Sequence, residues 1–94
     1  MIKNITTIAN SLWTYRKKMG LSQKRVAHLL GLYGTNGLSR WEHGVKLPNL
    51  VNLLKLEIVY RVPAAFLFGD LYRKLRDEIR GREEKLKKDL AEYE

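Results

Sequence analysis

Residues 22–44 constrain the fold of this chain more than any other stretch. Apolar residues recur there at steps of three and four, the spacing that places side chains on one face of an α-helix. They form two groups, Val26, Ala27 and Leu30 in the first and Leu38 and Trp41 in the second, with Val45 just beyond. Gly31 ends the first group and favours the left-handed conformation that closes a helix. The pattern predicts two short helices joined by a tight turn and packed on one core.

The second of these helices must turn a polar face outward when its apolar residues are buried. That outward face consists of Thr35, Asn36, Gly37, Ser39, Arg40 and His43. All six are polar or small, so this face is suited to contacting a polar partner and contributes little to packing.

The motif S-Q-x-x-V-A-x-x-L-G-L, followed by L-S-R-W-E-x-G, resembles the lambda-repressor-like helix-turn-helix family, the Cro and phage-repressor type. The resemblance runs from about Leu12 to Phe68. It implies an all-α fold, a five-helix DNA-binding domain with a C-terminal helical extension. In one respect the chain departs from the family, because Gly37 stands where an apolar residue is expected and Leu38 follows one place later. We place the extra residue in the turn at residues 32–34, which leaves the start of the recognition helix open.

The resemblance also assigns roles to residues around the second helix. It implies that Arg16 pairs with Glu42 and ties the first helix of the domain to the recognition helix. A buried pair of this kind contributes orientation more than net stability. Gln23 is implied to bond a DNA phosphate and to brace the recognition helix.

The first turn of the recognition helix holds the candidate base-reading residues. Thr35 or Asn36 can cap this helix, and that is the structural alternative for both. As readers in the major groove, Asn36 can bond adenine at N6 and N7 and Arg40 can bond guanine at O6 and N7. Thr35 can touch a thymine methyl group, and Gly37 would allow close approach of the backbone.

Candidate phosphate-binding residues flank this helix. Lys24 lies in the first turn of the preceding helix, where a cation opposes the helix dipole unless an anion binds there. The full set is Gln23, Lys24, Ser39, His43 and Lys46. No metal site is expected at His28 or His43, because the chain has no cysteine and no acidic residue at ligand spacing.

Three further helices complete the expected domain. The first runs from Thr6 or Thr7 to Lys18 and is closed by Gly20. The fourth begins at Asn49, after Pro48. It is predicted to be entirely core from its apolar residues, with Glu57 at the rim or paired; these apolar residues are Leu50, Leu53, Leu54, Leu56 and Ile58. The fifth, Ala64 to Phe68, is expected to close the core with Phe66 or Leu67.

The predicted organisation is a helix-turn-helix domain at residues 1–69 and a charged C-terminal helix at residues 70–94. Tyr72, Leu75, Ile79, Leu86 and Tyr93 follow a partial heptad that Arg82 and Asp89 interrupt. Two alternatives stay open for this helix. It packs on its own domain and then frays, with its charges in intrahelical pairs, or it dimerises.

Charge separates these two parts of the chain. Residues 1–69 hold ten basic and two acidic side chains, whereas residues 70–94 hold eight of each. The net charge of +8 thus lies wholly on the part with the motif, as in a nucleic-acid-binding protein. The absence of cysteine excludes disulfides, and no apolar run reaches the roughly 20 residues of a membrane helix. We expect a cytoplasmic, nucleoid-associated protein that uses no cofactor, does not engage a membrane and is not an enzyme.

The hypothesis is a sequence-specific binder of double-stranded DNA, a transcriptional repressor acting as a homodimer on an inverted repeat. One alternative is the antitoxin of a toxin-antitoxin pair, with residues 70–94 bound to a toxin or another protein partner. A second is a protein-interaction module with a vestigial helix-turn-helix. The neighbouring gene discriminates the antitoxin, and salt-dependent DNA binding discriminates the interaction module.

Overall fold

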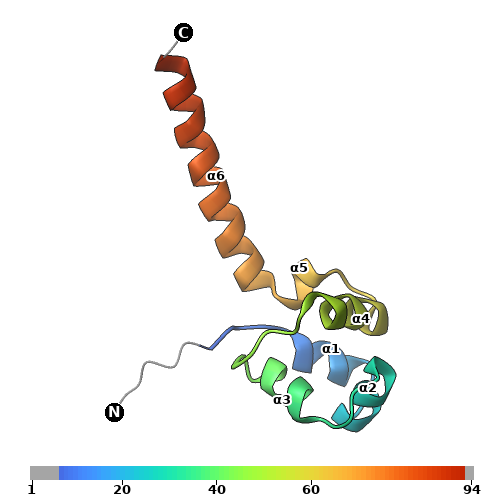
Figure 1. The fold of residues 1–94 in the computed structure, drawn as a ribbon. Helices are drawn as coiled ribbons and strands as arrows, with labels where there is room; N and C mark the ends of the chain where they lie inside the picture. Colours follow the sequence, from blue (N-terminus) through green and yellow to red (C-terminus); the bar gives the residue numbers. More distant parts are fainter. Residues whose placement is uncertain (1–6, 93–94) are drawn as a thin grey trace.

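The computed structural model describes residues 7–92, which fold into six helices (Figure 1). These are α1 (Leu12–Lys18), α2 (Gln23–Leu30), α3 (Asn36–Glu42), α4 (Leu50–Tyr60), α5 (Ala64–Leu67) and α6 (Gly69–Glu92). Helices α1 to α5 gather into one domain, and α6 extends away from it. The predicted all-α class, with five helices and a C-terminal helical extension, is confirmed. None of the helices in residues 7–92 is both long and apolar enough to cross a membrane.

The core of the five-helix domain draws side chains from every one of its helices. Its buried apolar residues are Leu12, Val26, Ala27, Leu30, Leu38, Trp41, Leu56, Tyr60, Leu67 and Phe68. The predicted shared core of α2 and α3 is therefore confirmed. Val45 is 56% exposed, so the expectation that it joins this core is wrong. It follows the left-handed Gly44, where the chain turns away from the α3 axis.

The ends of α2 follow the signals in its sequence. Ser22 caps its N-terminus, with its Oγ accepting from the backbone N–H of Arg25 at 3.1 Å. Gly31 ends it in the left-handed conformation, at φ 76°. Lys55 of α4 donates to the carbonyl of Leu30 at 2.9 Å, which satisfies an acceptor at the C-terminus of α2. The chain then needs residues 31–35 to reach α3, which accommodates the extra residue of the turn.

The first helix is shorter than predicted. It begins at Leu12, and residues 7–11 are not helical; Thr6, the other proposed start, lies outside the described residues. The backbone N–H of Ile8 donates to the carbonyl of Gly44 at 2.8 Å, and that of Ser11 donates to the carbonyl of Leu67 at 2.8 Å. These long-range bonds compete with helical ones, so the segment crosses the domain as an extended strap.

The outer face of α4 differs from the expectation of an all-core helix. Asn49, the predicted start of this helix, is its N-cap, and its side chain accepts from the N–H of Asn52 at 2.9 Å. However, Leu50, Leu54 and Ile58 are 69%, 49% and 75% exposed. They lie on the side away from the core, and no other described element covers them. Glu57 is half-buried.

The short helix α5 closes the core with Leu67, which is fully buried, and with the following Phe68. Phe66, the other candidate, is 61% exposed. The chain then enters α6, a continuous helix of 24 residues that Gly81 does not interrupt. Leu71 packs partly against the core, but no residue of α6 is buried.

Candidate nucleic-acid interface

The outward face of α3 carries the residues proposed to read bases. Asn36 and Arg40 lie one turn apart and are both exposed, whereas Leu38 and Trp41 on the opposite side are buried. Thr35, Gly37 and Ser39 are half-buried along the same helix. The structure thus turns an amide and a guanidinium outward together, a combination able to bond nucleobase edges.

Thr35 precedes α3 but does not cap it. Its backbone is already near-helical, with φ −94° and ψ −4°, and its side chain makes no capping hydrogen bond. Asn36 is the first residue of the helix rather than its cap. The capping role considered for both side chains is therefore wrong, because an N-cap needs an extended backbone to direct its oxygen at the N–H groups.

Glu42 is withdrawn from the outward face by a hydrogen-bonded network. Arg16 of α1 donates to both carboxylate oxygens, from Nε at 2.6 Å and from Nη2 at 3.1 Å. Gln23 of α2 donates from Nε2 to the same carboxylate at 2.9 Å. The remaining Arg16 nitrogen, Nη1, donates to the carbonyl of Leu21 at 3.0 Å. One carboxylate therefore joins α1, α2 and α3, and its negative charge is compensated inside the domain.

Two ionisable groups in and beside this network have raised pKa values. The hydrogen bond to Glu42 raises the pKa of Arg16, whose side chain is only 8% exposed. Burial raises the pKa of Tyr60, and the nearby charge of Glu42 raises it further. The hydroxyl of Tyr60 is buried and has no hydrogen-bond partner among the described residues. At neutral pH Arg16 is therefore protonated and Tyr60 is neutral.

Basic side chains surround the exposed face of α3. Lys24, His43 and Lys46 are all exposed, on α2, at the end of α3 and in the loop that follows. Lys24 and Thr35 line one shallow hollow of about 410 Å³ between α2 and the turn. His43 holds its Nδ1 at 2.7 Å from the carbonyl of Ser39, which orients the imidazole along the helix end. The rim of this face is therefore cationic.

Asn10 is important to this arrangement and was not predicted from the sequence, whereas Gly44 was predicted to end the recognition helix. The side chain of Asn10 donates to the carbonyl of Trp41 at 2.9 Å and accepts from the N–H of Leu12 at 3.1 Å. Gly44 adopts φ 75°, and a Cβ there would collide with the backbone of Ile8. The N-terminal strap therefore fixes the C-terminal end of α3. The Asn10-Ser11 pair before Leu12 was a usable signal, since both residues favour helix N-termini.

Among residues 7–92, no group of three or more His, Cys, Asp or Glu side chains is placed to hold a metal ion.

Comparison with known proteins identifies the fold. A family model described as helix-turn-helix matches residues 14–67, which is more than half of the chain and spans α1 to α5. No match was found among proteins with curated descriptions. The matched family comprises DNA-binding regulators of the lambda-repressor-like type. With its buried α2–α3 pair and its exposed α3 face, the chain belongs to this helix-turn-helix family.

Proposed function

We propose that this protein is a sequence-specific transcriptional repressor that binds double-stranded DNA as a homodimer. The observation that carries the proposal is the division of α3 into two sides. Leu38 and Trp41 are buried, Asn36 and Arg40 are exposed, and the carboxylate of Glu42 is neutralised by Arg16. A cationic, polar helix face without an outward carboxylate is compatible with a phosphate-lined groove.

Base selection is assigned to the first turn and a half of α3. Asn36 bonds adenine through N6 and N7, and Arg40 bonds guanine through O6 and N7. Thr35 contacts a thymine methyl group beside them. Gly37 lets the backbone approach the bases. Packing does not explain a glycine at this position, because a Cβ would meet only Trp41, at 3.8 Å.

Phosphate contacts set the position of the domain on the duplex. They are assigned to Gln23, Lys24, Ser39, His43 and Lys46. Contacts of this type supply affinity that is independent of sequence and falls with salt. The Arg16–Glu42 pair acts as a clamp, because it holds α3 at a fixed angle to α1 while these contacts form.

A two-fold homodimer places two copies of α3 on successive turns of one DNA face. The operator is then an inverted repeat whose half-sites are about 34–36 Å apart, one helical turn. Binding of this kind represses transcription where the operator overlaps a promoter.

The test is selection of bound fragments from a random DNA pool, followed by titration of the selected and a scrambled duplex between 50 and 200 mM salt. Arg40→Ala should weaken binding to the selected duplex by about 1–3 kcal/mol and leave the scrambled duplex almost unaffected. Lys24→Ala should weaken both alike and reduce the salt slope. Lys87→Ala, which removes an exposed lysine of α6, is the matched control. If the random pool gives no preferred sequence and DNA binding does not depend on salt, the proposal is overturned and an interaction module is favoured.

A further inference from the structure

Helix α6 carries an apolar stripe that no described part of the chain covers. We define the α6 stripe as Leu71, Tyr72, Leu75, Ile79, Leu86 and Leu90. At 3.6 residues per turn these side chains fall within an arc of about 100°. Leu71 is half-buried on its own domain, and the other five are 48–57% exposed. Most helical stability in proteins comes from packing of an amphipathic face, so this exposed stripe is a candidate interface.

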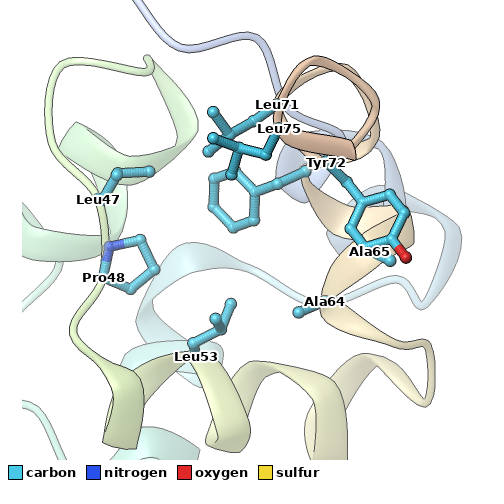
Figure 2. Close-up of a pocket in the computed structure, with 9 residues that line it drawn as sticks. Leu47, Pro48, Leu53, Ala64, Ala65, Leu71, Tyr72 and Leu75 are labelled. Atoms are coloured by element: carbon cyan, nitrogen blue, oxygen red, sulfur yellow. The ribbon is translucent and has the colours of Figure 1, made fainter. Parts of the chain in front are cut away.

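The stripe continues into an apolar groove at the base of α6. This groove has a volume of about 220 Å³ and lies between α6 and the loop before α4. Figure 2 shows Leu47 and Pro48 on one side, Leu53 below, and Leu71 and Leu75 of α6 on the other side. Leu71 and Leu75 belong to both the groove and the stripe. The two therefore form one apolar surface that runs from the domain along α6.

We propose that this surface binds the same surface of a second copy, with the two α6 helices antiparallel. The proposal names the interface of the homodimer and rests on the proposed function for that role. With the two-fold axis between Arg80 and Gly81, Leu75 faces Leu86 of the second copy, and Leu90 of the second copy lies level with Leu71. That Leu90 then lies at the mouth of the groove, so each copy covers the groove of the other.

The two charged interruptions of the stripe decide the orientation. In the antiparallel pair, Arg82 packs its aliphatic stem on Ile79 of the second copy, and Asp89 meets the phenol of Tyr72. In a parallel pair, each Arg82 would face Arg82 and each Asp89 would face Asp89. Like charges at facing core positions oppose association, so the parallel pair is disfavoured.

The charges that flank the stripe agree with this choice. In the antiparallel register Glu78 lies opposite Lys85 of the second copy, and Arg76 lies opposite its Glu83. By symmetry each attractive pair forms twice. Within the described chain, the ion pairs of α6 are Asp70–Arg73 and Arg76–Asp77, and Glu78, Glu83 and Lys85 are in none. A parallel pair would instead bring Glu78 against Glu83.

This arrangement keeps the two domains apart. The two Gly69 residues, where α6 leaves each domain, would lie about 35 Å apart along the helix axis at 1.5 Å per residue. The separation of the two domains is then set by the length of α6 and not by contact between the domains.

Sedimentation of the full chain and of two matched variants tests which surface associates. Leu86→Glu places a carboxylate in the stripe and should convert the dimer to a monomer. Ile58→Glu makes the same change at an exposed apolar residue of α4 and should leave the dimer intact. A monomeric wild type, or a dimer lost with Ile58→Glu and kept with Leu86→Glu, would overturn the proposal.

Disulfide cross-linking tests the orientation, because the chain has no cysteine of its own. A mixture of Leu75→Cys and Leu86→Cys proteins should oxidise to the heterodimer, with little homodimer of either. Predominant homodimers would indicate a parallel pair and overturn the proposed register.

Charge reversal tests the flanking pairs. Glu78→Lys should weaken dimerisation about tenfold, because two attractive pairs become repulsive. Adding Lys85→Glu should restore it. Failure of this rescue would contradict the register. Binding of the wild type and of each variant to a single half-site is measured alongside. A wild-type dimer that Leu86→Glu leaves intact defeats this inference alone, whereas a wild-type dimer that binds no DNA defeats the proposed DNA-binding function alone.

Discussion

The five-helix domain and α6 use the same chemical groups in opposite ways. In the domain, Arg16 and Glu42 form an ion pair with side chains 8% and 3% exposed. In α6, Arg73 and Asp70 form one with side chains 57% and 66% exposed. The first pair joins separate helices, and the second joins neighbours on one helix. The contrast shows that burial, and not the presence of an ion pair, decides whether a charge fixes the fold.

The largest expected effect comes from breaking the buried pair. Arg16→Met should lower the free energy of unfolding by about 3–5 kcal/mol, because it leaves the carboxylate of Glu42 buried without its cation. Urea denaturation measures this effect. Arg73→Met is the matched control in α6 and should cost less than about 1 kcal/mol. Equal costs for the two variants would contradict the comparison.

Glycine substitutions test the same difference between the five-helix domain and α6 in the backbone. Gly44→Ala should cost about 3 kcal/mol, because it combines a positive φ with a clash against Ile8. Gly31→Ala, at a positive φ with open space, should cost only about 1–2 kcal/mol. Gly81→Ala in α6 should stabilise the protein by about 0.5–1 kcal/mol. Thermal or urea unfolding of the three variants measures the order of their stabilities. If Gly44→Ala is as stable as Gly31→Ala, the close contact between Gly44 and Ile8 does not contribute to stability.

Gly37→Ala separates stability from binding within the domain. It should leave the fold as stable or raise stability by about 0.5–1 kcal/mol, since the glycine is in a helix and a Cβ fits. We expect binding to the selected duplex to fall about tenfold, because the added methyl group holds the backbone away from the bases. Fluorescence anisotropy measures the binding, with Gly81→Ala as the control. Unchanged affinity would mean that the backbone at Gly37 does not approach DNA.

The smallest effect is expected at Tyr60 and depends on pH. Burial penalises the phenolate and holds the folded-state pKa of Tyr60 above its ordinary value of about 10. Ionisation of Tyr60 therefore leaves stability unchanged below pH 10 and lowers it as the pH rises further, because the unfolded chain loses this proton first. Tyr60→Phe should flatten that alkaline loss. It should also stabilise the protein by about 1 kcal/mol at pH 7, because it removes a buried hydroxyl without a partner. Urea titrations between pH 7 and 11 test both statements, and an unchanged alkaline slope would count against the first.

The local signals of the sequence predicted much of the domain. Gly31 and the spacing of Leu38 and Trp41 predicted the end of α2 and the buried side of α3, because helix ends and periodicity depend on neighbouring residues. They left the start of α3 open. The resemblance to the family added the pairing of Arg16 with Glu42. Together these features predicted which face of α3 points outward.

The remaining errors concern interactions between distant residues. The start of α1 depends on hydrogen bonds from Ile8 to Gly44 and from Ser11 to Leu67, which no local pattern reveals. On α4, Leu50 and Leu54 have the same hydrophobicity as the buried Leu56, so periodicity could not tell the exposed face from the core. At the site, Asn10 escaped notice because its partner, the carbonyl of Trp41, is 31 positions away.

The guanidinium of Arg16 links its own helix, α1, to the carbonyl of Leu21 before α2 and to the carboxylate of Glu42 on α3. Such a joint leaves α3 no freedom to swivel inside its domain when it meets an imperfect operator. In the proposed homodimer, adjustment to a half-site displaced along or around the duplex would then come from the junction at Gly69, where α6 leaves the domain. Tolerance for variable operator spacing should accordingly respond to substitution at Gly69 and be insensitive to changes within the motif.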